Sequence, residues 1–483
     1  MPNTDAALTE VPLRELPLER FDSVLSSAGA ARLHRYLAAA GPLFAGRTVW
    51  NLNSTARGGG VAEMLAALGP YARGAGVDAR WLVVNGRDGF FKLTKRLHNR
   101  LHGAAGDGGP LGEDERRAYE AALAPAGREI ASRVGPRDVV ILHDPQTAGL
   151  IPVLKELGIP VLWRAHIGVD APGDLARSAW RFLQPYVSAA DICVFSRSSY
   201  AWDGIDTERC AFISPSIDPF APKNEDLDDA TVSAILRAAD LRVGEPDGAR
   251  PRFTRTDGTS DEVRRKVIVD RARPLRVGEP FVLQVSRWDA LKDPVGVVDS
   301  FVRYIAPGSE AHLVYAGPAV DAVADDPEGA QVLDRVRAHR RELPDDVRSR
   351  VHLAMLPMDD LEENAAIVNA LQRAASVVVQ KSLAEGFGLT VAEAMWKARP
   401  VVASAVGGIV DQIEHERSGL LLPDPRDGVA LGAAVRRLLH DEDEATALGL
   451  AARERVREHF LSDRSLIDYL KLLAGLLGAP PSR

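Results

Sequence analysis

Short runs of apolar, largely β-branched residues recur along the chain and alternate with longer stretches of helical periodicity. RTVWNL from Arg47, DVVILHD from Asp138 and SVVVQ from Ser376 are three of the short runs. Most are continuously apolar, which is typical of strands buried on both faces of a parallel sheet. Helical patterns lie between them, such as those from Val61 and Asp359. The alternation predicts an α/β chain with two doubly wound sheets. Strands are expected near Arg47, Arg80, Asp138, Pro160, Asp191, Ala211, Pro280, Ala311, Val351, Ser376, Pro400 and Gly419.

Prolines suggest where the chain divides. At 483 residues it is long enough for two large domains or three ordinary ones. Two prolines interrupt the apolar pattern in SPSIDP, residues 214–219, and we place a boundary directly after it. We therefore expect Rossmann-like domains over 1–219 and 220–464, followed by a C-terminal helix and tail over 465–483.

The segment 225–279 differs in character from the rest. Much of it is rich in Gly, Arg and Asp and lacks strand or helix periodicity, so we expect a loop insertion at the surface of the second domain. The hexapeptide LRVGEP begins twice in this segment, at Leu241 and at Leu275. Six residues are too few to indicate a repeat architecture, and chance or a small local duplication accounts for them.

The composition excludes several classes of protein. There are 59 Lys and Arg against 67 Asp and Glu, a net charge of −8, which argues against a general nucleic-acid binder. The two cysteines, Cys193 and Cys210, exclude a disulfide framework and a four-cysteine zinc site. No signal peptide and no run of about 18 apolar residues is visible. We expect a cytoplasmic protein that neither spans a membrane nor binds nucleic acid.

A glycine-rich turn follows the first predicted strand. In NLNSTARGGGVAEML, Gly58, Gly59 and Gly60 come directly before a helix that starts near Val61. Glycines there allow close approach of a ligand, and free helix N–H groups favour an anion. A tight turn without a ligand explains the pattern equally well. The glycines do not form GxGxxG and no P-loop is present, which disfavours a dinucleotide oxidoreductase or a kinase.

Two further loops in the second half carry charged groups. Arg287 and Lys292 follow the strand that ends in QVSR, at the carboxyl end where parallel sheets bind ligands, and two cations there suit a diphosphate. Glu385 lies in the loop EGFGL, and Glu393 lies one turn into a helix that begins near Leu389. That helix start offers N–H donors to a phosphate. The alternatives are a solvated basic loop, and glutamates that merely complement a helix dipole.

Histidines stand at the ends of two strands in the first half. His143 and Asp144 follow one strand in ILHDPQ, and His166 follows the next in WRAHIGVD. A histidine at a sheet rim can bind a sugar hydroxyl or orient a developing charge. A lone histidine is more often structural, but two at successive strand ends favour one shared site.

Together these motifs resemble a known family. Arg287, Lys292 and the E-x7-E pair Glu385/Glu393 in EGFGLTVAEAM are similar to the donor site of retaining glycosyltransferases of the GT-B fold, family 4. Within that family, NLNSTARGGGVAEML, GFFKLTKRLHNRLHG from Gly89, HDPQ, WRAHI and SPSIDP resemble the trehalose glycosyltransferring synthases. Arg57 departs from that pattern, which has an aromatic residue before the glycines. The resemblance implies two Rossmann-like domains that face a central cleft, with the acceptor side in the first and the nucleotide-sugar site in the second.

The resemblance also implies roles on the donor side. Arg287 and Lys292 bind the donor diphosphate and stabilise the leaving group. Glu385 contacts the transferred glucose and Glu393 the ribose. Backbone N–H groups contact the distal phosphate from Gly388, Leu389 and Thr390.

Further roles fall to the first domain. Gly59 and Gly60 close over the phosphates, and His166 lies beside the donor sugar. With the donor-side residues, the expected catalytic residues are then Arg287, Lys292, Glu385 and His166. The acceptor side is bordered by Asp144, Lys95, His98 and Asn99.

The implied reaction moves glucose from a nucleoside diphosphate glucose to free glucose with retention, giving α,α-trehalose. The cations and the helix N-terminus can neutralise the leaving group without a metal, so no cofactor and no catalytic divalent ion are expected. A homodimer would fit the family, and the base of the donor stays open. Alternatives are another family 4 hexosyltransferase of glycogen or sucrose type, and a non-catalytic sugar-nucleotide-binding protein. An oxidoreductase would need the missing GxGxxG.

Overall fold

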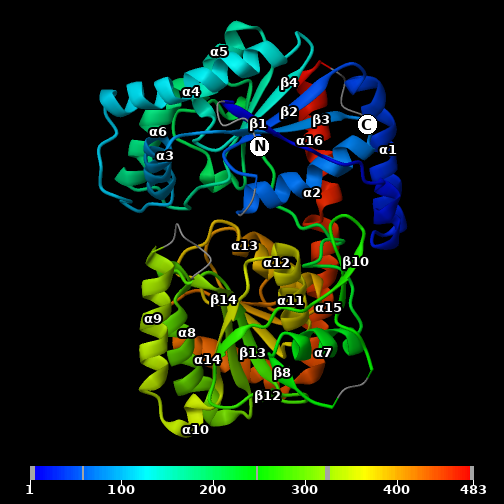
Figure 1. Ribbon diagram of the computed structural model, residues 1–483, viewed down its shortest axis with the longest axis vertical. Coiled ribbons are helices and arrows are strands. Elements are labelled where there is room, and N and C mark those ends of the chain that lie inside the picture. Colours follow the sequence, from blue (N-terminus) through cyan, green and yellow to red (C-terminus); the bar gives the residue numbers. More distant parts are fainter. Residues whose placement is uncertain (1–5, 57–58, 246–247, 321–326, 479–483) are drawn as a thin grey trace. The chain divides into compact units, whose positions relative to one another are not determined.

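The computed structural model describes residues 6–56, 59–245, 248–320 and 327–478, and it comprises two compact α/β units (Figure 1). One unit consists of Met1–Ser216 together with Ser462–Arg483, and the other of Ile217–Leu461. These limits lie three residues before the predicted boundaries after 219 and 464. Arg57 and Gly58 of the glycine-rich turn lie outside the described residues.

A parallel sheet forms the centre of the first unit. Within the described residues it has seven strands, and only β1 runs antiparallel to its neighbour. In spatial order the strands are β1 (Leu8–Val11), β3 (Asp78–Val84), β2 (Thr48–Asn53), β4 (Val139–His143), β5 (Val161–Arg164), β6 (Ile192–Phe195) and β7 (Cys210–Phe212). The sequence predicts six of these; β1 is missed because it is a four-residue edge strand with two exposed residues.

Helices cover both faces of this sheet, which explains why its strands are continuously apolar. Trp50 and Leu52 pack in one core with residues of α3, α4 and α6, whereas Trp81 and Val83 pack on the other face against α2. The C-terminal helix α16 lies beside α1 and α2 (Figure 1). The helices are η1 (Leu18–Ser23), α1 (Ser27–Phe44), α2 (Gly60–Gly74), α3 (Asp88–Leu101), α4 (Glu113–Arg133), η2 (Ala148–Leu150), α5 (Ile151–Glu156), α6 (Asp174–Val187), η3 (Ser198–Tyr200), η4 (Thr207–Arg209) and α16 (Ser462–Leu476).

The second unit is built in the same way. Its main sheet also has seven strands in the described part of the chain, with only β11 antiparallel. The order is β11 (Ile268–Asp270), β15 (Val351–Leu356), β14 (His312–Pro318), β13 (Phe281–Val285), β16 (Val377–Gln380), β17 (Val401–Ser404) and β18 (Leu420–Leu422). All six strands predicted from Pro280 onwards are present, which confirms the two doubly wound sheets.

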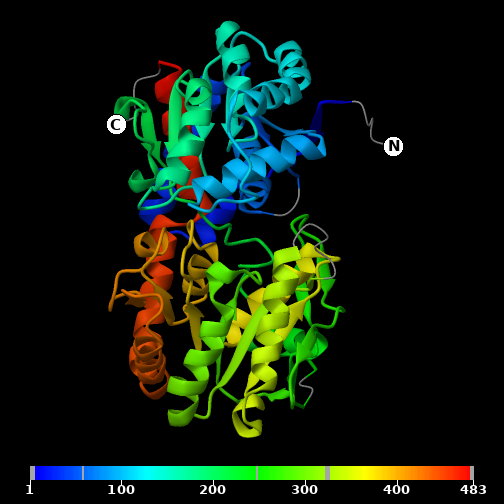
Figure 2. The ribbon, with the colours of Figure 1, turned by 90° about the vertical axis from the view of Figure 1, so that its left-hand side faces the viewer.

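Helices cover this second sheet as well. On one of its sides, α9 (Pro327–Arg341, yellow-green) lies beside α8 (Pro294–Ser300) (Figure 2). No helix of the described ranges is both long and apolar enough to cross a membrane. The helices of the second unit are α7 (Asp229–Ala238), η5 (Ala290–Lys292), α8 (Pro294–Ser300), η6 (Phe301–Ile305), η7 (Ala306–Gly308), α9 (Pro327–Arg341), α10 (Asp345–Arg348), α11 (Leu361–Ala374), α12 (Leu389–Trp396), α13 (Ile409–Gln412), α14 (Gly428–His440) and α15 (Glu442–His459).

The expectation of an irregular loop over 225–279 is wrong. The segment contains α7 and β11, together with four strands of two or three residues: β8 (Arg242–Val243), β9 (Arg252–Thr254), β10 (Ser260–Glu262) and β12 (Leu275–Arg276). The β9–β10 hairpin is anchored because Arg255 bonds Asp261 at 2.8 Å and Glu362 at 3.0 Å. Strands this short leave no periodicity in the sequence, and the anchoring partners on α11 lie about a hundred positions away.

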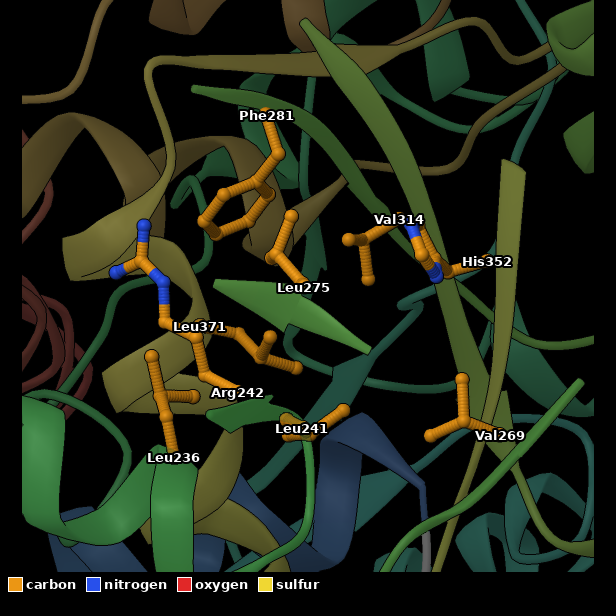
Figure 3. A pocket seen from close by; sticks show the side chains of 9 residues that line it. All are labelled: Leu236, Leu241, Arg242, Val269, Leu275, Phe281, Val314, His352 and Leu371. Atoms are coloured by element: carbon orange, nitrogen blue, oxygen red, sulfur yellow. The ribbon is translucent and has the colours of Figure 1, made fainter. Parts of the chain in front are cut away.

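The first residues of the two LRVGEP copies lie on paired strands. Strands β8 and β12 run parallel, with Leu275 opposite Arg242. They cover a cavity of about 10 Å³, which has room for roughly one water molecule. Figure 3 shows Arg242 and His352 on opposite sides of it, with apolar side chains between them. The cavity is too small for a metabolite.

Candidate functional site

An ion pair joins the two charged loops of the second unit. Strands β13 and β16 are neighbours in the sheet, so their carboxyl ends place the following loops side by side. Lys292 Nζ lies 2.6 Å from Glu385 Oε2, and Ser382 Oγ donates to the same oxygen at 3.2 Å. Only 13% of the Lys292 side chain and 12% of the Glu385 side chain are exposed. The structure therefore brings two predicted catalytic residues into direct contact.

A buried amide ties these loops together. Gln284, which is fully buried on β13, donates from Nε2 to the Lys292 carbonyl at 3.0 Å. Its Oε1 accepts from the Lys381 backbone N–H at 3.0 Å. The buried Lys381 ammonium forms an ion pair with Asp293, which has a left-handed φ of 47°. Sequence reasoning gave Gln284 and Lys381 no role, although they begin the motifs QVSRWDALKD and KSLAEGFGL that it used.

The N-terminus of α12 follows the Glu385 loop. Gly388 caps this helix with a φ of 82°, a conformation that glycine adopts without strain. The first N–H groups of a helix, here from Leu389 and Thr390, have no acceptor within the helix and carry its positive dipole end. Thr390 is held from the side, because its Oγ1 donates to Gln380 Oε1 at 3.2 Å. The three backbone positions predicted for a phosphate thus stand beside the Lys292–Glu385 pair.

Glu393 is buried one turn further along α12. Its side chain is 5% exposed, and Oε1 lies 3.6 Å from Lys223 Nζ. Its other oxygen, Oε2, is buried without a hydrogen-bond partner among the described residues. Lys397 Nζ donates to the Glu393 carbonyl at 3.0 Å, and burial lowers the pKa of Lys397 to about 7. A buried carboxylate oxygen without a partner is costly, so this position fits a ligand hydroxyl that donates to it.

Arg287 takes a different position from Lys292. Its side chain is 66% exposed, and its guanidinium pairs with Asp289 at 3.0 Å. The structure places it at the carboxyl end of β13, as predicted, with a carboxylate of its own loop as its ion-pair partner.

In the first unit, the polar residues His143, Asp144 and His166 lie at the carboxyl ends of β4 and β5. His143 Nδ1 lies 3.0 Å from His166 Nε2, and the two rings stack with centroids 5.3 Å apart. Asp144, at a φ of 60°, accepts the His166 backbone N–H at 2.7 Å. His143 Nε2 also lies 3.3 Å from Asn51 Oδ1, a contact that the sequence did not reveal. The two histidines are thus neighbours in the structure, and their role in a shared site stays a prediction.

Burial changes the ionisation of this cluster. It lowers the pKa of His143 to about 3 and that of His166 well below its ordinary value, with the charge of Arg164 acting in the same direction. It raises the pKa of Asp144 to about 7, against the effect of its hydrogen bond from His166. Both histidines are therefore neutral near pH 7, and Asp144 titrates there. A carboxyl group with such a pKa can act as an acceptor or exchange a proton.

The remaining predicted residues lie on α2 and α3. Gly59 caps α2 at a φ of 87°, and a Cβ on Gly59 or Gly60 would meet no atom of the described residues beyond its chain neighbours within 4 Å.

Helix α3 carries the predicted acceptor residues Lys95, His98 and Asn99. The rings of His98 and His102 are in contact in a tilted arrangement, with centroids 4.9 Å apart, and Asn99 lies against Gly106 in the loop after the helix. Neither contact connects α3 to the His143–His166 cluster. The acceptor role of Lys95, His98 and Asn99 stays a prediction.

Among the residues that the structure describes, no three His, Cys, Asp or Glu side chains are grouped so that they could hold a metal ion. The independence of the reaction from metal stays a prediction.

Two family descriptions match the chain. Residues 51–202 match "Trehalose synthase, N-terminal domain", and residues 268–455 match "Glycosyl transferases group 1". The first match contains the glycine-rich turn, α3 and the histidine cluster. The second contains the Lys292–Glu385 pair and α12.

Curated relatives agree with these matches. The chain is 36% identical over 436 residues to the trehalose synthase of Rubrobacter xylanophilus, which covers 90% of this chain and 91% of that protein. It is 28% identical over 407 residues to the trehalose phosphorylase of Pleurotus sajor-caju, covering 78% of this chain and 51% of that protein.

Among solved structures, the chain resembles an α,α-trehalose-phosphate synthase (UDP-forming) from Burkholderia vietnamiensis. The TM-score is 0.63 at 17% identity, over 90% of this chain and 99% of that one. At this identity the likeness concerns the fold, and it confirms the predicted GT-B fold.

Proposed function

This chain belongs to the trehalose synthase family of glycosyltransferases, enzymes of trehalose-related glycosyl transfer, and from this premise we propose a specific reaction for it. The enzyme transfers glucose from a nucleoside diphosphate glucose to free glucose, with retention at the anomeric carbon, and forms α,α-trehalose. The alternative of a non-catalytic sugar-nucleotide-binding protein is set aside because the family consists of enzymes.

The observation that carries the proposal is the contact of Lys292 with Glu385 beside the N-terminus of α12. Breaking the bond between the anomeric carbon and a diphosphate releases negative charge on the leaving group. Lys292 and the first N–H groups of α12 supply positive charge at one place, already oriented, and such preorganised charge is the largest source of catalysis in many enzymes. Glu385 holds Lys292 in position and offers its own oxygens to the hydroxyls of the transferred glucose.

The nucleoside end of the donor belongs at Glu393. Its unpartnered Oε2 would accept hydrogen bonds from the ribose hydroxyls, which removes the penalty of a buried carboxylate oxygen without a donor. Arg287, with two-thirds of its side chain exposed, would leave Asp289 and bind the diphosphate. The same site would bind the donor without a metal ion.

The first unit would supply the sugar side. His166 and Asp144 would contact the glucosyl group and the acceptor, and Gly59 and Gly60 would cover the phosphates. Retention would follow from attack on the same face from which the diphosphate leaves, since no carboxylate in these motifs is suited to form a covalent intermediate. The acceptor hydroxyl then needs positioning rather than strong activation.

The test incubates the purified protein with ADP-, UDP- or GDP-glucose and free glucose, with and without EDTA. The expected product is a non-reducing disaccharide that trehalase cleaves, formed equally well in EDTA, and the best donor identifies the base. Release of nucleoside diphosphate without this disaccharide would contradict the proposed acceptor and favour another hexosyl acceptor, as in glycogen- or sucrose-type enzymes.

The similarity to trehalose phosphorylase favours a second candidate, in which inorganic phosphate takes the place of the nucleoside diphosphate. That enzyme would split trehalose with phosphate to glucose and glucose 1-phosphate. Incubation with trehalose and phosphate separates the two: glucose 1-phosphate should form only under the second candidate. The buried Glu393, which has no task in a phosphorolysis without ribose, favours the first.

A further inference from the structure

Three polar side chains form a row across neighbouring strands of the first unit. Asn51 lies on β2, His143 ends β4, and His166 follows β5. Asn51 Oδ1 is 3.3 Å from His143 Nε2, and His143 Nδ1 is 3.0 Å from His166 Nε2. His143 therefore uses both of its ring nitrogens and His166 uses Nε2, so the row begins at the amide oxygen of Asn51 and ends at His166.

The direction of hydrogen bonding along this row follows from what each atom can do. Both rings are neutral near pH 7 because burial lowers their pKa values. A neutral imidazole has one donor nitrogen and one acceptor nitrogen, and an amide oxygen only accepts. His143 therefore donates from Nε2 to Asn51, which leaves its Nδ1 as an acceptor. His166 must then donate from Nε2 to His143, which leaves its own Nδ1 as an acceptor.

We propose that Asn51 and His143 are positioning residues that hold His166 as the Nε2–H tautomer, so that its Nδ1 accepts a hydrogen bond from a hydroxyl of the substrate sugar. This inference rests on the proposed glucosyl transfer, because it assigns His166 to a sugar. Nδ1 of His166 has no hydrogen-bond partner among the described residues. It is also not a buried atom, so a ligand can reach it. The His166 backbone is fixed separately by Asp144 at 2.7 Å.

The tautomer decides which part of the donor His166 can bind. An acceptor nitrogen takes a hydrogen bond from a sugar hydroxyl and repels the oxygens of a diphosphate, which only accept. The opposite tautomer, or an imidazolium ion, would present an N–H and favour phosphate. The row of Asn51, His143 and His166 thus assigns His166 to a sugar hydroxyl rather than to a diphosphate.

The first experiment reads the tautomer directly. The full-length protein is labelled with ¹⁵N in its histidine rings, and long-range ¹H–¹⁵N correlations distinguish protonated from unprotonated ring nitrogens; loss of one spin system in His166→Gln assigns His166. We expect a protonated Nε2 and an unprotonated Nδ1 at pH 7.5. A protonated Nδ1 in the wild-type protein would overturn the proposal, since the row would then run in the opposite direction.

Two substitutions of His143 separate hydrogen bonding from packing. His143→Gln retains an acceptor for His166, whereas His143→Met has similar length and no such acceptor. A neighbouring cavity of about 60 Å³, lined by His143, Ile141 and Tyr469, leaves space for either side chain. We expect His143→Met to lose the single tautomer of His166 and to lower kcat on the order of 10²-fold, as misplaced contacts do. His143→Gln should restore the tautomer and most of kcat.

Two controls complete the design. Ile141→Val removes a methyl group from the same cavity wall and should lower Tm without changing the tautomer or the ratio of kcat to KM. Binding of free nucleoside diphosphate should be unchanged in His143→Met, because that ligand lacks the sugar. If His143→Met keeps both the tautomer and kcat of the wild type, the proposal is wrong. If the wild type transfers no glucose yet shows the expected tautomer and its loss in His143→Met, the proposed function is contradicted. The positioning of His166 by Asn51 and His143 is supported in that case.

Discussion

The ammonium nitrogen of Lys292 lies 2.6 Å from Oε2 of Glu385, although the two residues are 93 positions apart in the sequence. The contact exists because β13 and β16 are neighbours in the sheet and because Gln284 bonds to the backbone of both loops. Each residue therefore depends on the other for its orientation. A substitution at either position should affect the reaction through a defined change in charge.

Replacing Lys292 with alanine should remove the charge that stabilises the leaving group. We expect kcat to fall roughly 10²–10³-fold, the loss typical of one preorganised donor. Steady-state kinetics with the preferred nucleoside diphosphate glucose measure it. Lys266→Ala, which removes an exposed lysine outside the site, serves as the control and should retain wild-type kcat. A kcat for Lys292→Ala within threefold of the control would contradict the donor-site assignment.

Replacing Glu385 with glutamine keeps the size of the side chain and removes its charge. The amide pairs poorly with both Lys292 and the sugar hydroxyls, so we expect transfer to be abolished. Free nucleoside diphosphate should still bind with similar affinity by calorimetry, since it has no glucose to contact Glu385. Loss of this binding would instead move the role of Glu385 to the phosphate or the nucleoside.

Gly407 should tolerate no side chain. Its φ is 52°, and a Cβ at this position would lie 1.8 Å from the carbonyl oxygen of Glu385. Gly407→Ala should therefore destabilise the protein by about 3 kcal/mol or more, as severe overpacking does, and lower kcat by displacing the Glu385 loop. Gly278 is the matched control, because its φ is 90° and its added Cβ would meet nothing within 4 Å. Urea denaturation compares the two alanine variants, and equal losses would show that backbone conformation rather than the clash dominates.

A second histidine pair should make the protein sensitive to acid. His312 Nδ1 lies 2.9 Å from His352 Nε2. Burial lowers the pKa of His312 to about 4, and the charge of Arg273 acts in the same direction. Burial also lowers the pKa of His352 to about 3. The unfolded chain takes up these protons below about pH 6.5. Stability from the pair is therefore complete above that pH and is lost as the pH falls towards 4, by up to about 1.4 kcal/mol per unit for each group.

The corresponding measurement compares wild type with His312→Gln/His352→Gln by urea denaturation at pH 7.5 and pH 5. The amide pair cannot take up protons, so the double variant should lose less stability between the two pH values than the wild type. Identical pH dependence in the two proteins would show that other groups govern acid unfolding.

The sequence alone was sufficient for the fold class and for the motifs. Continuous apolar runs mark strands covered on both faces, and glycines with charges after such runs mark ligand loops, because both signals are local. The sequence did not predict strand β1 or the strands of the segment 225–279, because an exposed edge strand and strands of two or three residues have no measurable period. Family resemblance then added roles that no local pattern contains.

Tertiary structure decided which of these residues meet. The order of strands in each sheet brings Lys292 to Glu385 and His143 to His166. Burial then lowered the pKa values of both histidines and raised that of Asp144, and it enclosed an oxygen of Glu393 that has no hydrogen-bond partner in the described part of the chain. Desolvation and long-range pairing depend on the complete fold, because the groups that exclude water and supply partners come from distant parts of the chain.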